Sequence, residues 1–145
     1  MATQQYSLRD LPSPYYRVAT RAVIIDEQHR ILVMQNHGGD YELPGGGWEY
    51  DEPFDVCLTR EISEELGVEV AAVEPNILGV YRGRNSYGMT LRIAVRVTLK
   101  SYDFKPVDMA HAWFVTREEF LELDFIPAAD EGMKDYAGII WPTEM

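Results

Sequence analysis

The segment between Asp51 and Gly67 constrains the fold most, because it contains the signals for both ends of a helix. At its start an acid, Asp51, precedes Pro53, and proline is tolerated in the first turn of a helix. At its end Gly67 suits the left-handed position that follows a helix. The apolar residues between these ends recur at helical spacing and can face a core: Leu58, Ile62 and Leu66. The segment therefore predicts an amphipathic helix.

The runs on either side of this helix are typical of strands. Residues 17–26 and 31–35 are rich in β-branched side chains and flank a polar stretch, which predicts a hairpin. Further strands are expected at 41–43, 68–73, 77–82, 89–99 and 113–115. Residues 116–123 suit a short helix, with Thr116 as its cap and Glu119 three residues later, and residues 128–136 are compatible with another helix. This mixture predicts a mixed sheet flanked by helices, an α/β fold.

The composition limits the partners of the chain. A length of 145 residues suits a single domain, in which residues 1–14 form an irregular leader. Cys57 is the only cysteine, which excludes an intramolecular disulfide and a four-thiolate metal site. A net charge of −11 argues against a nucleic-acid polymer as the main partner, although a small phosphorylated ligand is still allowed. Without a signal peptide or a run of about 20 apolar residues, we expect a cytoplasmic protein that does not enter membranes.

Three carboxylates share one narrow stripe of the predicted helix. Glu64 lies about 60° to one side of Glu61, and Glu65 lies about 40° to the other. Like charges at this spacing repel, and acids in the last turn oppose the helix dipole, so the stripe costs stability. An isolated stripe of this kind is most often a solvated surface. Next to a glycine-rich turn, it is better explained by a hard divalent cation such as Mg²⁺.

The region that starts at Gly46 and ends at Val68 resembles the Nudix box at every fixed position. Glu52 follows Gly46 after five residues, and after seven more comes the run REISEELGV, residues 60–68. The turn before it, Leu43 to Gly47, resembles the one that leads into the box. The resemblance implies a Nudix-type α/β/α sandwich with a mixed sheet, and a pyrophosphohydrolase. Members cut between the two phosphates of a nucleoside diphosphate that is linked to another group.

The resemblance also implies roles for individual residues. Glu61, Glu64 and Glu65 would hold Mg²⁺ or Mn²⁺, helped by a carbonyl of the glycine turn, which we assign to Gly45 with Gly46 as the neighbouring option. Arg60 and Glu52 are expected to pair, so that Glu52 orients the loop and the helix. Catalysis is accordingly expected from the group Glu61, Glu64, Arg60 and Glu52. A metal ion would neutralise the diphosphate and lower the pKa of a bound water.

The chain departs from the family pattern in two places. Asp51 and Pro53 replace the usual glycine and Ser or Thr cap, and Asp51 could serve as the cap instead. Ala110 stands three residues before Trp113, where members often have a glutamate that acts as base or ligand. The base is therefore open, with Glu61 preferred among the box residues. The alternatives nearby are Asp103, Asp108, His111, Asp130 and Glu131.

Substrate-binding residues are harder to assign. Arg82 and Arg84 lie two apart on a strand, so both could clamp a phosphate, with Arg92 close by across the hairpin. Tyr87 could stack on a base. Trp48 is expected in the core under the glycine turn, and Cys57 is expected to pack rather than to react.

The function within the family stays open at this point. The three intact glutamates favour an enzyme over a non-catalytic Nudix-fold module that binds a nucleotide or regulates a partner. The expected partner is a nucleotide-like small molecule. Nucleoside triphosphates, nucleotide sugars and dinucleotides are all possible substrates, and a homodimer is possible because family dimers are common.

Overall fold

The strands of the described residues form two three-stranded sheets. The computed structural model describes residues 15–85, 88–105, 111–123, 137 and 141. In chain order the elements are β1 (Arg17–Val23), β2 (Ile31–Gln35), β3 (Tyr41–Glu42), α1 (Phe54–Leu66), β4 (Val70–Asn85), β5 (Gly88–Leu99), β6 (His111–Val115) and α2 (Arg117–Glu122). The strand orders are β1-β5-β4 in one sheet and β3-β2-β6 in the other.

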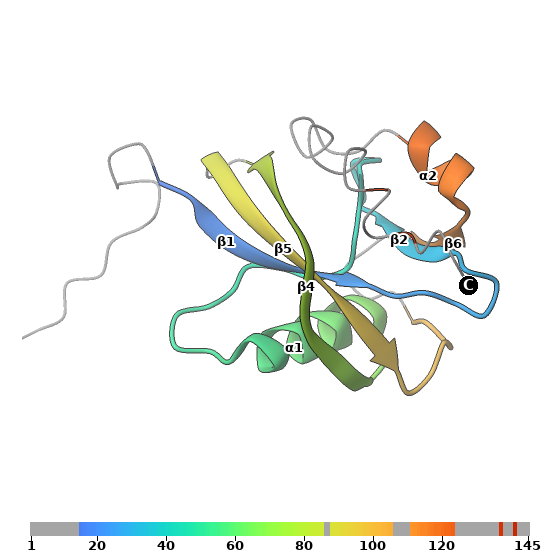
Figure 1. Ribbon diagram of the computed structural model, residues 1–145, viewed down its shortest axis with the longest axis horizontal. Helices are drawn as coiled ribbons and strands as arrows, with labels where there is room; N and C mark the ends of the chain where they lie inside the picture. The colour runs from blue at the N-terminus through green and yellow to red at the C-terminus, as the bar shows by residue number, and fades with distance from the viewer. Residues whose placement is uncertain (1–14, 86–87, 106–110, 124–136, 138–140, 142–145) are drawn as a thin grey trace, which may run out of the picture.

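The first sheet is mixed, because β1 runs parallel to β5 while β4 runs antiparallel to it. Helix α1 packs along one face of this sheet, and α2 lies beside β2 and β6 of the second sheet (Figure 1). The second sheet is antiparallel throughout. The prediction of an α/β fold with a mixed sheet is therefore confirmed.

The prediction that residues 17–26 and 31–35 pair as a hairpin is wrong. β1 pairs with β5, whereas β2 pairs with β3 and β6. The two runs touch only next to their connection, where Ile25 bridges Ile31 and the Leu32 amide donates to the Ile24 carbonyl. From Ala19 to Val23 every residue of β1 is buried, which is typical of a strand that is covered on both faces. A strand of this kind lies inside a sheet that is covered on both sides, and β1 takes this place by pairing with β5.

The ends of helix α1 agree only in part with the sequence. Gly67 adopts φ 66° and donates its amide to the Ser63 carbonyl, so the predicted C-terminal cap is confirmed. At the other end the cap position belongs to Pro53, which has no side-chain hydrogen bond to the helix. Asp51 lies outside the helix at φ 62°, so the expectation that it caps the helix is wrong. The turn before the helix, rather than capping, determines the position of Asp51.

β4 is one strand where two were predicted. It continues through Pro75, and its register against β5 shifts between Val73 and Ile77 and again before Gly79. Proline cannot donate a ladder hydrogen bond, so the irregularity falls where the sequence interrupts the pairing. The predicted break is therefore a bulged segment.

Helix α2 begins as the sequence predicted. The Thr116 hydroxyl accepts from the Glu119 amide at 3.2 Å, and the Glu119 carboxylate accepts from the Thr116 amide at 3.1 Å. This reciprocal capping box holds the first turn. A box of this kind depends on four consecutive residues, so it could be recognised without knowledge of the fold.

Two apolar clusters hold the layers together. One joins α1 to β1 and β5 and includes the predicted core residues Leu58, Ile62 and Leu66. The other joins the opposite face of the first sheet to the second sheet and α2. No helix in the described part of the chain is both long and apolar enough to cross a membrane. The leader expected at 1–14 and the helix expected at 128–136 lie outside the described residues.

Candidate active site

The site is built where the glycine turn runs along the edge of β1. The Gly46 carbonyl accepts from the Thr20 amide at 2.8 Å, and the Pro44 carbonyl accepts from the Ala22 amide at 2.7 Å. A third bond runs from the Trp48 amide to the Val18 carbonyl at 3.0 Å. These bonds follow β1 as a neighbouring strand would, so the turn is fixed to the sheet.

The glycines of the turn are required by close approaches. Gly45 has φ 138°, and a side chain there would run into the backbone of Thr20 and Arg21. At Gly46 a Cβ atom would overlap the carboxylate of Glu61. The turn and helix α1 therefore meet with backbone directly against a glutamate, the close contact that the sequence pattern led us to expect.

The three glutamates of the predicted stripe have different surroundings. Glu65 is buried, and its Oε1 accepts from the Gly45 amide at 3.0 Å. The side chain of Glu61 is 17% exposed, and that of Glu64 is 51% exposed. Burial raises the pKa of Glu65 to about 8, despite the opposing effects of the Arg21 charge and the Gly45 amide. At Glu65 the effect of burial thus outweighs that of the Arg21 charge.

Arg60 links the helix to the loop that precedes it. Its Nε donates to Glu52 Oε2 at 2.9 Å and its Nη2 donates to Glu52 Oε1 at 3.0 Å, which is the predicted pair in bidentate form. Its Nη1 donates to Glu61 at 2.9 Å and to Glu64 at 3.4 Å. Hydrogen bonds from Arg60 lower the pKa of Glu52 to about 2, so Glu52 is ionised at neutral pH. Arg60 thus neutralises part of the stripe.

The donor set of the stripe suits a hard cation, although its atoms do not converge on one point. Among the described residues no three carboxylates, imidazoles or thiolates form a group that could hold a metal ion. Glu61 and Glu64 are directed to Arg60, and Glu65 is directed to Gly45. The Gly46 carbonyl accepts from Thr20, which leaves Gly45 as the better carbonyl candidate. Carboxylate and carbonyl oxygens are the ligands that Mg²⁺ prefers, so the chemistry fits.

The register places Arg92 on a different face of the sheet from Arg82. Arg82 is exposed on β4 and lies opposite Leu91, whereas Arg92 lies opposite Tyr81. Successive residues of a strand point to opposite faces, so Arg82 and Arg92 face different ways and Arg92 does not join Arg82 in a clamp. The predicted pairing of Arg82 with Arg84 stays a prediction. Of Arg84 the structure describes only the backbone in β4, and Tyr87 lies outside the described residues.

Several other predicted side chains can be placed. Trp48 is 39% exposed and packs edge-on against Phe54, so the expected core position is wrong. Cys57 is buried, as expected. Asp103 and His111, alternatives for the base, are exposed. The remaining alternatives Asp108, Asp130 and Glu131 lie outside the described residues.

Sequence reasoning missed Arg21, which is buried in the middle of β1 beside the glycine turn. Its Nη2 lies 3.7 Å from Glu42 Oε2, and its Nη1 donates to the Thr20 carbonyl at 3.0 Å. Burial alone would lower the pKa of Arg21, but the charges of Glu42, Glu65 and Glu61 raise it. A charged residue inside the run RVATRAVIID was the available signal, since a charge in a fully buried strand needs a partner.

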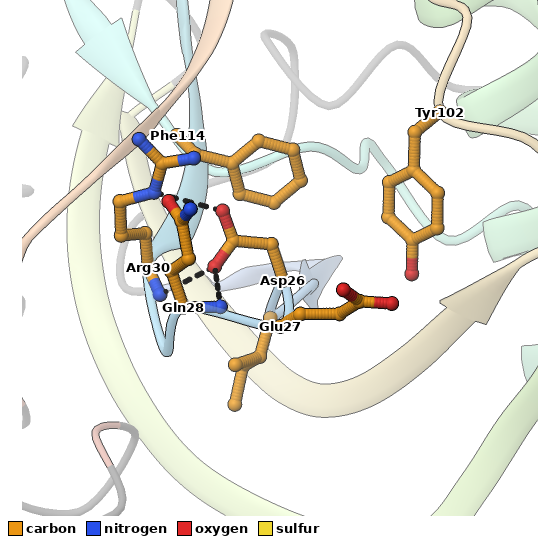
Figure 2. Close-up of a pocket in the computed structure, with 7 residues that line it drawn as sticks. Asp26, Glu27, Gln28, Arg30, Tyr102 and Phe114 are labelled. Atoms are coloured by element: carbon orange, nitrogen blue, oxygen red, sulfur yellow. Dashed lines mark hydrogen bonds and ion pairs between the residues drawn. The ribbon is translucent and has the colours of Figure 1, made fainter.

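A cavity of about 470 Å³ lies away from these groups. It is lined by residues of the β1–β2 connection together with Tyr102 and Phe114 (Figure 2). Asp26 accepts there from Arg30 Nε at 2.8 Å and from the amides of Gln28 and Arg30. Its carboxylate is therefore used by the turn, and no predicted site residue lines this cavity.

The family is decided by comparison with known proteins. The family model for the NUDIX domain matches residues 15–136, which is most of the chain. The chain belongs to the Nudix family. The predicted Nudix hydrolase assignment is thereby confirmed at the level of the family.

Two curated relatives illustrate the likeness. A MutT-like protein of Streptomyces ambofaciens is 36% identical over 70 residues, which is 48% of this chain and 44% of the relative. An RNA pyrophosphohydrolase of Saccharophagus degradans is 29% identical over 104 residues, which is 70% of this chain and 57% of the relative. The chain thus spans about half the length of these two curated relatives.

Among solved structures, the MutT protein of Methanosarcina mazei Go1 has a TM-score of 0.74 at 21% identity. The match covers 88% of this chain and 96% of that chain. At this identity the likeness concerns the fold, and it confirms the predicted Nudix-type architecture.

Proposed function

We propose that the chain hydrolyses the pyrophosphate bond of a nucleoside diphosphate linked to another moiety, by attack of water on phosphorus, with Mg²⁺ or Mn²⁺. The observation that carries the proposal is the contact between the glycine turn and the glutamate stripe of α1. There the buried carboxylate of Glu65 accepts from Gly45, whose backbone has a conformation that suits glycine. Membership of the Nudix family supports the same chemistry.

The metal would be held by Glu61, Glu64 and Glu65 with the carbonyl of Gly45. When bound, it would neutralise the diphosphate and lower the pKa of a coordinated water. To bind the metal, Glu61 and Glu64 would give up their hydrogen bonds to Arg60, whose Nη1 they share in this structure. The raised pKa of Glu65 agrees with a site that needs a cation to stay ionised near neutral pH.

The other predicted residues would position the reacting groups. Glu52 and Arg60 form a bidentate pair that fixes the loop before α1 to the middle of the helix. Glu61 is the preferred proton acceptor, because its carboxylate lies against Gly46 at the inner side of the stripe while Glu64 is half exposed. Holding water and diphosphate in line would supply much of the rate enhancement.

A substrate panel tests the proposed reaction. Nucleoside triphosphates, nucleotide sugars, dinucleotides and triphosphorylated RNA would be incubated with Mg²⁺ and with Mn²⁺. The released mononucleotide would be identified, or, for RNA, the released pyrophosphate or phosphate. We expect turnover of at least one compound. Failure of all of them, with a Tm that metal does not change, would instead support a non-catalytic nucleotide-binding module.

A double variant tests the metal residues. Glu64→Gln with Glu65→Gln should abolish turnover while leaving the fold intact or more stable, because two repelling carboxylates disappear. The matched control is Glu118→Gln with Glu122→Gln, which removes the same charge from exposed positions on α2. Turnover and thermal unfolding would be measured for both. Wild-type turnover in the first variant would remove the metal assignment.

A further inference from the structure

Arg17, Arg21 and Arg92 lie on the face of the first sheet that points away from α1. Ala19 of β1 pairs with Arg92 of β5, so Arg92 points to the same face as Arg17 and Arg21, two residues to either side of Ala19. Tyr81 of β4 pairs with Arg92 from the other side. This face meets the second sheet, where Tyr81 and the neighbouring Ala94 are part of the apolar cluster. A chain of net charge −11 thus collects cations on one largely covered surface.

Two glycines make room for these arginines. A Cβ atom on Gly83 would overlap the guanidinium of Arg92, and one on Gly47 would overlap that of Arg17. Neither glycine has a positive φ, so the space, and not the backbone conformation, is the reason for glycine there. Arg92 consequently reaches β4 at Gly83, and its Cζ lies 5.9 Å from the centre of the Tyr81 ring.

The charge of Arg92 is not balanced within the described part of the chain. Arg92 is 3% exposed, yet its Nε and Nη1 have no hydrogen-bond partner among the described residues. The same holds for the hydroxyl of Thr90, which lies two residues earlier on the same face and is 2% exposed. The charge of Glu42 also acts on Arg92, but Glu42 forms its ion pair with Arg21. A buried charge with unused donors is costly unless a ligand completes it.

Arg21 couples this face electrostatically to the glutamate stripe, although α1 packs on the opposite face of the sheet. The negative charges of Glu61 and Glu65 act on Arg21, and the positive charge of Arg21 acts in turn on Arg92. Arg21 also lies against Gly45 of the glycine turn. A ligand that reaches from the stripe across Arg21 would therefore meet Arg92 and Thr90.

We propose that Arg92, with Thr90 beside it, binds a phosphate group of the substrate and so selects substrates that place phosphate on this face of the sheet. The proposal rests on the proposed function for the identity of the substrate. Guanidinium is suited to phosphate because its N–H groups are fixed in a planar fork and it stays charged when buried. Phosphate is favoured over a neutral carbonyl because only an anion balances the charge.

Binding of inorganic pyrophosphate in EDTA tests this site without metal and without turnover. Calorimetric titration should show saturable binding to the wild type. Arg92→Met should weaken it about 10- to 100-fold, as expected for loss of a charged hydrogen-bond partner. The matched control is Arg96→Met, an exposed arginine on the same strand, which should bind as the wild type does. Unchanged affinity in Arg92→Met would overturn the proposal.

Thermal unfolding separates a ligand-binding role from a structural one. Without pyrophosphate, Arg92→Met should have a Tm equal to or above that of the wild type, because it removes an unbalanced buried charge. A lower Tm would show that Arg92 is paired within the fold and would overturn the proposal. Loss of binding to an uncharged nucleoside in Arg92→Met would also overturn it, since a base carbonyl would then be the partner.

A second variant keeps the charge. Gly83→Ala retains the arginine and its charge, but the added methyl group displaces the guanidinium of Arg92. The affinity for pyrophosphate should therefore fall as in Arg92→Met. Wild-type affinity in Gly83→Ala would overturn the proposal even if Arg92→Met failed to fold. Because neither measurement involves hydrolysis, their failure would leave the proposed reaction standing.

Discussion

At the scale of single residues, Glu65 has the most unusual surroundings. It is buried, it accepts one backbone amide, and its pKa is about 8 because burial outweighs the charge of Arg21. Buried arginines lie on the other side of the same turn. The site therefore holds charges of both signs that are only partly compensated, which is typical of a place that binds a charged ligand.

The raised pKa of Glu65 predicts how stability changes with pH in the metal-free protein. In the unfolded chain a glutamate ionises near pH 4.5, whereas the folded protein holds this proton up to about pH 8. Between these values Glu65 binds more protons in the folded state than in the unfolded state, so its contribution to the free energy of unfolding falls as the pH rises. The fall is at most about 1.4 kcal/mol for each pH unit.

Urea unfolding in EDTA across this range would measure the slope. Glu65→Gln should remove it, because the amide cannot ionise and its oxygen can still accept from Gly45. Glu69→Gln, at an exposed position on the other side of Gly67, should keep it. A wild-type slope that survives in Glu65→Gln would show that another group is responsible.

At the scale of elements, the contact between the glycine turn and α1 should be sensitive to one methyl group. Gly46→Ala places a Cβ on the Glu61 carboxylate, so turnover should fall about 100-fold, the usual cost of a displacement near 1 Å. Circular dichroism should be unchanged. Gly38→Ala is the control, because its methyl group meets only side chains of the neighbouring loop. Equal turnover in the two variants would contradict the described contact.

The elements also show which features sequence alone could predict. The end of α1 at Gly67 and the capping box of α2 were predictable, because each depends on residues within one or two turns. The partners of β1 were not, because parallel pairing with β5 joins residues more than 70 positions apart. The sequence of β1 has no alternation of polar and apolar residues that could indicate its partner, since both faces of the strand are buried.

The site divides in the same way. Glu61, Glu64, Glu65 and the glycine turn follow one another closely in sequence, and their grouping was predicted. Arg21, Glu42 and Arg92 lie on three different strands, so their meeting depends on the sheet order. Arg92 could be named from the sequence only as a neighbour of Arg82, and the register places it on the opposite face.

At the scale of the whole molecule, Trp141 joins segments that are far apart in the chain. Its ring packs edge-on against Phe120 at 5.2 Å, and its Nε1 donates to the His29 carbonyl at 2.8 Å. It is 5% exposed and belongs to the cluster between the two sheets. One side chain therefore connects the β1–β2 connection to α2.

Trp141→Ala should lower the free energy of unfolding by about 3 to 5 kcal/mol, as for other buried aromatic residues. Urea unfolding would measure the loss. Trp48→Ala, at a partly exposed indole, should cost clearly less. Similar losses in the two variants would show that Trp141 does not connect these segments.

The hydrogen bonds that fix the glycine turn to β1 make local opening of this turn measurable. The Thr20 and Ala22 amides are bonded to the turn and not to another strand. They can exchange with deuterium only when the turn detaches, so their exchange rates report the opening of the site itself. The protein thus contains two natural probes of the glycine turn, which can be followed before any substrate is known.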